Sequence, residues 1–119
     1  MTTIQQATPA EVRSGLADGS MLLVDVREVN EYGAERIPGA LLYPLSTFEP
    51  QALPRNSGRK IVVHCGGGGR STRAAQALVA AGYEQVFNLE GGIRAWKALG
   101  LPLIRIDPAT GRILEQGRI

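Results

Sequence analysis

The chain has 119 residues, of which 44% are hydrophobic, a combination that fits one compact domain and excludes a disordered composition. Thirteen Lys and Arg residues against eleven Asp and Glu residues leave a formal net charge of +2. The basic residues form no clustered stripe, so we expect no nucleic-acid binding. The chain contains no apolar run of about 18–20 residues and no secretory signal near Met1, so we expect no membrane span, no export and a cytoplasmic location.

Helical and strand patterns alternate along the chain. Thr8 predicts a helix start, because it can cap the helix, Pro9 suits the first helical position and Glu11 completes a capping box. In chain order we expect a helix ending at Gly19, a strand at Met21–Val26, a helical turn at Glu28–Tyr32 closed by Gly33, a strand at Leu41–Tyr43, a brief helix from Ser46 or Thr47, a strand at Lys60–His64, a loop at Cys65–Arg70, a helix at Ser71–Ala81, a strand at Gln85–Leu89 and a helix at Ile93–Leu99. This alternation predicts an α/β domain with a mainly parallel central sheet.

The tail differs from the rest of the chain. Two apolar segments, Leu103–Ile106 and Arg112–Leu114, flank a turn-forming stretch, Asp107–Gly111. The pattern fits a β-hairpin that packs or contacts another chain, and it also fits a flexible end. We therefore divide the chain into a domain at residues 1–103 and an extension at residues 104–119. The sequence does not indicate an oligomeric state.

The single cysteine, Cys65, excludes an intramolecular disulfide. The single histidine, His64, precedes it, and adjacent strand residues point to opposite faces, so the pair chelates a metal badly. We expect no metal site and no cofactor, and we interpret His64 as a packed strand residue.

The segment after the strand at Lys60–His64 carries the strongest chemical signal. It consists of Cys65, Gly66, Gly67, Gly68, Gly69, Arg70 and Ser71. Successive glycine amides at the start of a helix can form a nest for an anion. These amides, the helix N-terminus and the Arg70 charge should lower the pKa of the Cys65 thiol and yield a nucleophilic thiolate. Ligands of parallel α/β sheets bind beyond the carboxyl ends of the strands, which is where Cys65 is expected.

Three other interpretations of this loop fit the sequence less well. A flexible glycine linker does not need a cysteine at the strand end together with an arginine at the helix start. A phosphate-binding P-loop needs a lysine where this chain has Arg70. A dinucleotide-binding fold needs more chain than is present for its two halves.

Four motifs, in this order, make the sequence resemble the rhodanese-like domain family, and in particular its single-domain sulfurtransferases. They are Leu23–Glu28, Arg36–Ala40, Cys65–Ser71 and Leu89–Trp96. The resemblance covers about Thr8 to Leu103. Arg36 stands where the family commonly has a histidine.

The resemblance implies a three-layer α/β domain, with a central mainly parallel sheet flanked by helices, and a persulfide mechanism. Cys65 would take a sulfane sulfur from thiosulfate or a persulfide and pass it to cyanide or a thiol. The loop from Gly66 to Ser71 would hold that sulfur, with Asp25, Arg27 and Arg36 as candidates for a supporting shell. The loop from Cys65 to Arg70 has six residues, whereas the loop of the related phosphatases is one residue longer.

The sequence leaves two points open: whether the protein is an enzyme or a sulfur carrier, and which molecule donates the sulfur. The resemblance also fits a noncatalytic or carrier module that delivers sulfur to a protein partner. The positions from Gly66 to Gly69 carry no basic side chain to bind thiosulfate, so a protein-bound persulfide is a further candidate donor.

Overall fold

The computed structural model describes residues 3–55 and 57–119. The helices are α1 (Pro9–Asp18), α2 (Val29–Ala34), α3 (Gly69–Ala80) and α4 (Gly92–Ala98), with 3-10 turns η1 (Leu45–Thr47) and η2 (Pro50–Ala52). The strands are β1 (Gln5–Ala7), β2 (Met21–Asp25), β3 (Glu35–Arg36), β4 (Leu41–Leu42), β5 (Lys60–His64), β6 (Val86–Leu89), β7 (Ile104–Ile106) and β8 (Ile113–Gln116). Within these ranges, every helix is too short or too polar to traverse a bilayer.

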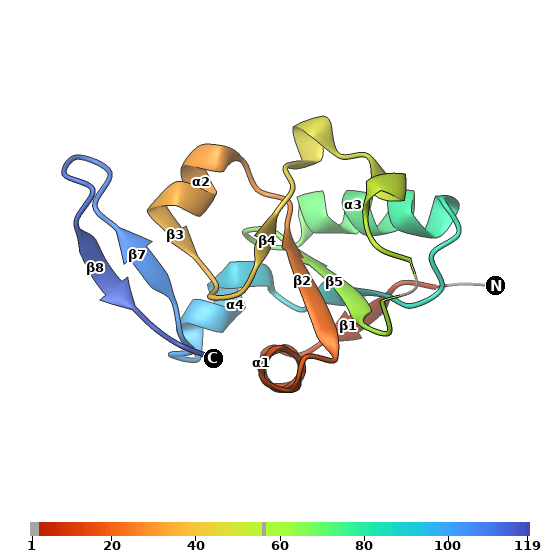
Figure 1. The fold of residues 1–119 in the computed structure, drawn as a ribbon, viewed down its shortest axis with the longest axis horizontal. Helices are drawn as coiled ribbons and strands as arrows, with labels where there is room; N and C mark the ends of the chain where they lie inside the picture. Colours follow the sequence, from red (N-terminus) through yellow and green to blue (C-terminus); the bar gives the residue numbers. More distant parts are fainter. Residues whose placement is uncertain (1–2, 56) are drawn as a thin grey trace.

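Five strands form a central sheet in the order β1-β6-β5-β2-β4, and every pairing in it is parallel. A second, antiparallel sheet has the order β3-β7-β8 and lies beside α2 (Figure 1). The expected α/β architecture with a mainly parallel central sheet is confirmed. In such a sheet the carboxyl ends of β2 and β5 lie at the same edge, which places the residues that follow these strands close together.

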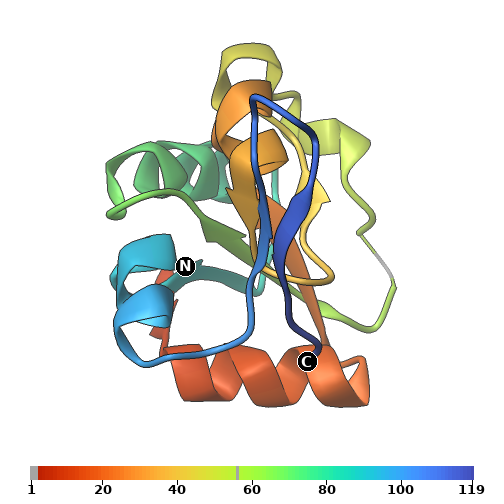
Figure 2. The same ribbon diagram turned by 90° about the vertical axis from the view of Figure 1, so that its left-hand side faces the viewer.

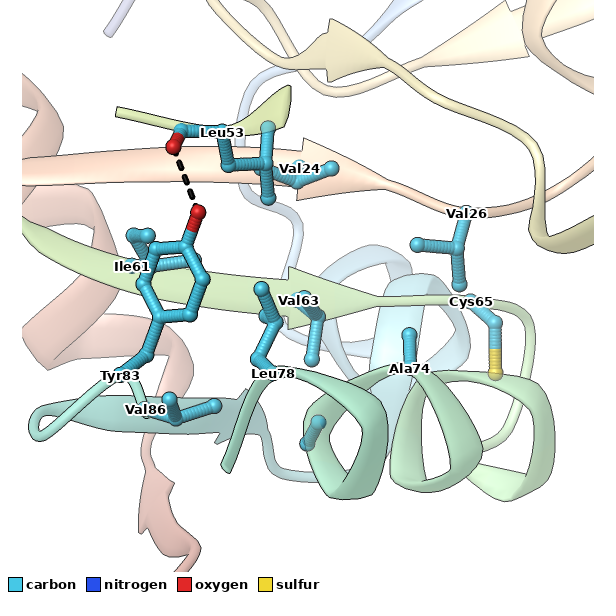
Figure 3. Packing of buried hydrophobic residues seen from close by; sticks show 11 residues of the cluster. Val24, Val26, Leu53, Ile61, Val63, Cys65, Ala74, Leu78, Tyr83 and Val86 are labelled. Atoms are coloured by element: carbon cyan, nitrogen blue, oxygen red, sulfur yellow. Dashed lines mark hydrogen bonds between the residues drawn. The ribbon is translucent and has the colours of Figure 1, made fainter. Parts of the chain in front are cut away.

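Both faces of the central sheet are covered, so the domain has three layers (Figure 2). Side chains alternate between the faces along each strand. Leu23 and Val62 belong to the core under α1 and α4, which includes the buried Trp96. Val24 and Val63 belong to the core under α3, part of which Figure 3 shows. The strands are apolar on both faces for this reason.

Local signals placed the first helix correctly. The side chain of Thr8 accepts a hydrogen bond from the Glu11 amide, the Glu11 carboxylate accepts one from the Thr8 amide, and Gly19 ends α1 in the left-handed conformation. Several predicted boundaries differ from the structure by one or two residues, and two of them involve glycines. Gly33 lies inside α2 rather than closing it. Helix α3 begins at Gly69 instead of Ser71, because the chain turns into the helix at Gly68, whose φ is +124°.

Two strands carry no apolar pattern and were not predicted. Strand β1 contains Gln5 and Gln6 and pairs with the buried β6 from the edge of the sheet. Strand β3 has only two residues and pairs with β7. The tail folds as an antiparallel pair, β7 and β8, that joins β3. The functional division of the chain into residues 1–103 and 104–119 stays a prediction.

Candidate active site

Cys65 directly follows β5 at the carboxyl edge of the central sheet. Its side chain is 2% exposed, and it closes one end of the hydrophobic core under α3. Figure 3 shows its sulfur beyond Ala74, turned toward the first turn of α3. The sulfur therefore faces the glycine loop rather than the interior of the core.

Hydrogen bonds from the loop reach the Cys65 sulfur. The amide of Gly68 donates to Sγ at 3.1 Å, and the thiol lies 3.5 Å from Ser71 Oγ. Burial raises the pKa of this thiol, but the Ser71 hydroxyl and the amides of Ser71, Gly68 and Arg70 outweigh burial, so that the pKa lies below its ordinary value. This arrangement favours a thiolate, the form that acts as a nucleophile.

A chain of polar side chains extends from Ser71 to the edge of the sheet. Ser71 Oγ lies 2.5 Å from Asn88 Oδ1, and Asn88 Nδ2 donates to Gln6 Oε1 at 3.1 Å. Ser71 and Asn88 are buried, whereas Gln6 is exposed on β1. A serine hydroxyl has one proton, so the ionised sulfur of Cys65 competes with Asn88 Oδ1 and the Gly68 carbonyl for the hydrogen bond from Ser71. Sequence reasoning missed Asn88 and Gln6, because only the pairing of β1 with β6 brings them together.

The rear of the loop is held by the start of α4. The amides of Ile93 and Arg94 donate to the carbonyls of Cys65 and Gly66, at 2.9 and 3.2 Å. A Cβ atom on Gly92 would lie 2.6 Å from each of these two carbonyl oxygens, and its φ is +60°. The Gly91–Gly92 motif thus permits a close approach of backbone to the cysteine loop.

The side chain of Arg70 is paired with a carboxylate of α2. Its guanidinium donates to both carboxylate oxygens of Glu31, at 2.6 and 3.0 Å. The hydrogen bond from Arg70 holds the pKa of Glu31 at about 2, well below its usual range. Since Glu31 largely neutralises Arg70, the loop amides and the Ser71 hydroxyl are the main groups that stabilise the thiolate. No local pattern predicts this pair, because α2 and α3 meet only in the folded chain.

Asp25 and Arg27 lie together beneath the same edge of the sheet. Both are at least 95% buried, and Arg27 Nη2 donates to Asp25 Oδ2 at 2.8 Å and to the Glu35 carbonyl at 2.6 Å. His64 Nε2 lies 3.5 Å from Asp25 Oδ2, and burial lowers the pKa of His64 despite this carboxylate. His64 is a fully buried strand residue, as expected. His64 therefore lies between the Asp25–Arg27 pair and Cys65, which follows it in the chain.

Arg36 is not brought to the loop by the contacts in the described part of the chain. Its guanidinium lies 5.1 Å from the centre of the Tyr32 ring, and its Nη1 donates to the Tyr32 carbonyl at 3.4 Å. Its strand, β3, pairs with β7 rather than with the central sheet. These contacts suit a residue that fixes α2 against β3.

Over residues 3–55 and 57–119, no three His, Cys, Asp or Glu side chains gather in a way that would hold a metal ion.

Comparison with known proteins shows the family of this chain. The rhodanese-like domain matches residues 8–99. The chain is 38% identical to a sulfurtransferase of Allochromatium vinosum over 84 residues, which are 71% of this chain and 78% of that protein. It is 41% identical to the protein slr1261 of Synechocystis over 100 residues, 84% of this chain but only 56% of the length of that protein.

A solved structure agrees with these sequence matches. The human single-domain sulfurtransferase TSTD1 superposes with a TM-score of 0.68 and 33% identity, covering 78% of this chain and 95% of the human chain. The rhodanese-like domain match at residues 8–99 includes the cysteine loop and the four motifs noted in the sequence. On these grounds the chain belongs to the rhodanese-like domain family.

Proposed function

We propose that this protein is a sulfurtransferase that carries a sulfane sulfur on Cys65. The observation that carries the proposal is the contact between the Gly68 amide and Cys65 Sγ at 3.1 Å, in a loop that ends in the first turn of α3. A thiolate in this position, with its pKa below the ordinary value, is a nucleophile that needs no adjacent base. The sulfurtransferases among the similar proteins add support.

The reaction has two steps. In the first, the Cys65 thiolate attacks the outer sulfur of a donor such as thiosulfate, an Sγ–S bond forms, the donor S–S bond breaks, and its electron pair leaves with sulfite. In the second, a thiophilic acceptor such as cyanide attacks the terminal sulfur, and the Cys65 thiolate is restored as thiocyanate leaves. Amides of Gly68, Arg70 and Ser71 stabilise the negative charge on sulfur in both steps, as an oxyanion hole does for oxygen. Small sulfur donors and acceptors are the partners that this cycle requires.

Replacement of the nucleophile tests the proposal. Cys65→Ser should abolish cyanide-dependent thiocyanate formation while leaving the far-UV circular dichroism and the unfolding midpoint nearly unchanged. Retained turnover in that variant would refute the assignment of Cys65. Persulfide transfer to a protein acceptor, with no turnover on cyanide, would instead favour the sulfur-carrier alternative.

A further inference from the structure

The side chain of Arg94 lies over the glycine loop. A Cβ atom built on Gly67 would stand 3.2 Å from Arg94 Nη1 and 3.6 Å from its Cζ. The Arg94 amide also donates to the Gly66 carbonyl at 3.2 Å, so both the backbone and the guanidinium of this residue border the loop. Because Gly67 has no side chain, the guanidinium can lie close to the loop backbone.

Two guanidinium groups therefore flank the loop, and they differ in their partners. Arg70 Nη2 lies 3.6 Å from the position of a Cβ on Gly66, but Arg70 is bonded to Glu31. For Arg94, no carboxylate within the described ranges lies in salt-bridge distance, and the residue is exposed. Of the two cations, Arg94 is the one whose charge is not already neutralised.

We propose that Arg94, beside the Gly67 backbone, forms a binding site for the anionic head group of the sulfur donor, an oxyanion of the sulfonate class with two negative charges. The inference rests on the proposed function and deepens it. The loop amides hold the sulfur that is transferred, and Arg94 holds the group that leaves. In the transfer, the Sγ–S bond forms as the donor S–S bond breaks, and the departing sulfite takes the electron pair and both charges to the side of Arg94.

This site changes the choice between donors. The positions from Gly66 to Gly69 offer no basic side chain, which taken alone disfavours thiosulfate. Arg94 adds the missing positive charge from a different part of the chain. The small loop residues are then part of the site, since Gly67→Ala would place a methyl group against the guanidinium and push it away from the loop.

Steady-state kinetics with two donors test the inference. The donors are thiosulfate and methanethiosulfonate, which has a methyl group in place of one charged oxygen. Arg94→Gln should raise the KM for thiosulfate about fivefold and that for methanethiosulfonate about twofold, with kcat nearly unchanged, because an exposed charge pair contributes at most about fivefold in affinity. Arg94→Lys should retain most of the affinity, and the effect of Arg94→Gln should shrink at high salt.

Arg59→Gln is the matched control, because Arg59 is exposed and precedes β5 at the opposite edge of the sheet. Equal KM values for thiosulfate in the Arg94→Gln and Arg59→Gln variants would overturn the inference.

A binding measurement separates this inference from the proposed function. Sulfate, a dianion that has no sulfur to transfer and does not react with iodoacetamide, should slow the alkylation of Cys65 by iodoacetamide in the wild type and do so much less in Arg94→Gln. If the wild type takes no sulfur from any donor but shows Arg94-dependent protection, the anion site stands and the sulfurtransferase proposal falls. If sulfur transfer occurs but neither the protection of Cys65 nor the KM for thiosulfate depends on Arg94, the sulfurtransferase proposal stands and the anion site falls.

Discussion

The guanidinium of Arg70 and the carboxylate of Glu31 form a doubly hydrogen-bonded ion pair, with Nη1–Oε1 at 2.6 Å and Nη2–Oε2 at 3.0 Å. The pair joins α2 to the first turn of α3, the turn that completes the cysteine loop. Arg70 therefore ties the loop to its neighbouring helix, and its charge is shared with Glu31 rather than directed at a ligand alone.

The ion pair predicts a pH-dependent part of the stability. Arg70 lowers the pKa of folded Glu31 to about 2, so the pair stabilises the fold above the ordinary glutamate pKa, and this contribution is lost as pH falls toward about 2. Both side chains are about one-third exposed, so we expect Glu31→Gln to cost less than about 1 kcal/mol at pH 7. Urea unfolding of wild type and variant should give a free-energy difference that shrinks as pH falls from about 4.5 toward about 2. A free-energy difference that stays constant down to acid pH would contradict this role.

The polar chain behind Cys65 predicts an order of thiol pKa values. Ser71→Ala removes the hydroxyl that faces Sγ and that lowers the pKa of Cys65, so this pKa should rise in the variant. Asn88→Ala removes an acceptor that competes with the sulfur for the single proton of Ser71, so it should lower the pKa of Cys65. Gln6→Ala, at the exposed end of the chain, is the matched control with the smallest effect. The pH dependence of thiolate absorbance, or of alkylation by iodoacetamide, gives the pKa of Cys65 in each variant. One common pKa in all three variants would show that the hydrogen bonds from Ser71 to Gln6 do not influence the thiol.

Two neighbouring glycines of the loop should respond differently to substitution. Gly68 has a φ of +124°, a conformation that alanine rarely adopts, so Gly68→Ala should cost about 1–3 kcal/mol of stability or displace the amide that binds Sγ. Gly69 lies in the first turn of α3, and a Cβ there would meet no atom within 4 Å. Gly69→Ala should therefore be neutral or stabilising by up to about 1 kcal/mol. Unfolding midpoints and sulfur-transfer rates compare the two; equal behaviour would mean that the backbone of Gly68 does not position the sulfur.

Much of the fold and the centre of the site follow from local sequence patterns. The apolar run at Lys60–His64 and the helical pattern after Gly69 can be recognised from residues that are adjacent in the sequence. The prediction that Cys65 lies at the end of the strand is confirmed. The chemical pattern of the loop itself was also local. The role of its glycines was partly misread, since Gly69 proved to be helical.

The remaining parts of the site depend on contacts between distant segments. Strand β1 has no apolar pattern, so nothing in the sequence placed Gln6 beside Asn88. Arg94 and Glu31 look like ordinary surface charges until the fold brings Arg94 against Gly67 and Glu31 against Arg70. These relationships arise from packing, which periodicity does not encode.

The buried pair beneath the loop predicts the largest loss of stability. Arg27→Met would leave the Asp25 carboxylate buried without its partner, and we expect a cost of about 3–5 kcal/mol. Lys97→Met is the matched control, because Lys97 pairs with Glu35 on the surface at 3.1 Å and should cost less than about 1 kcal/mol. Urea unfolding monitored by fluorescence measures both. Similar losses in the two variants would show that burial of the Asp25–Arg27 pair has no special energetic role.

The most direct test of the sulfur-carrying cysteine is the intact mass of the protein after incubation with thiosulfate or with a persulfide donor. We expect a gain of one sulfur atom in the wild type, its removal by cyanide, and no gain in Cys65→Ser. A wild-type mass that stays unchanged with both donors, while Cys65 still reacts with iodoacetamide, would contradict the account.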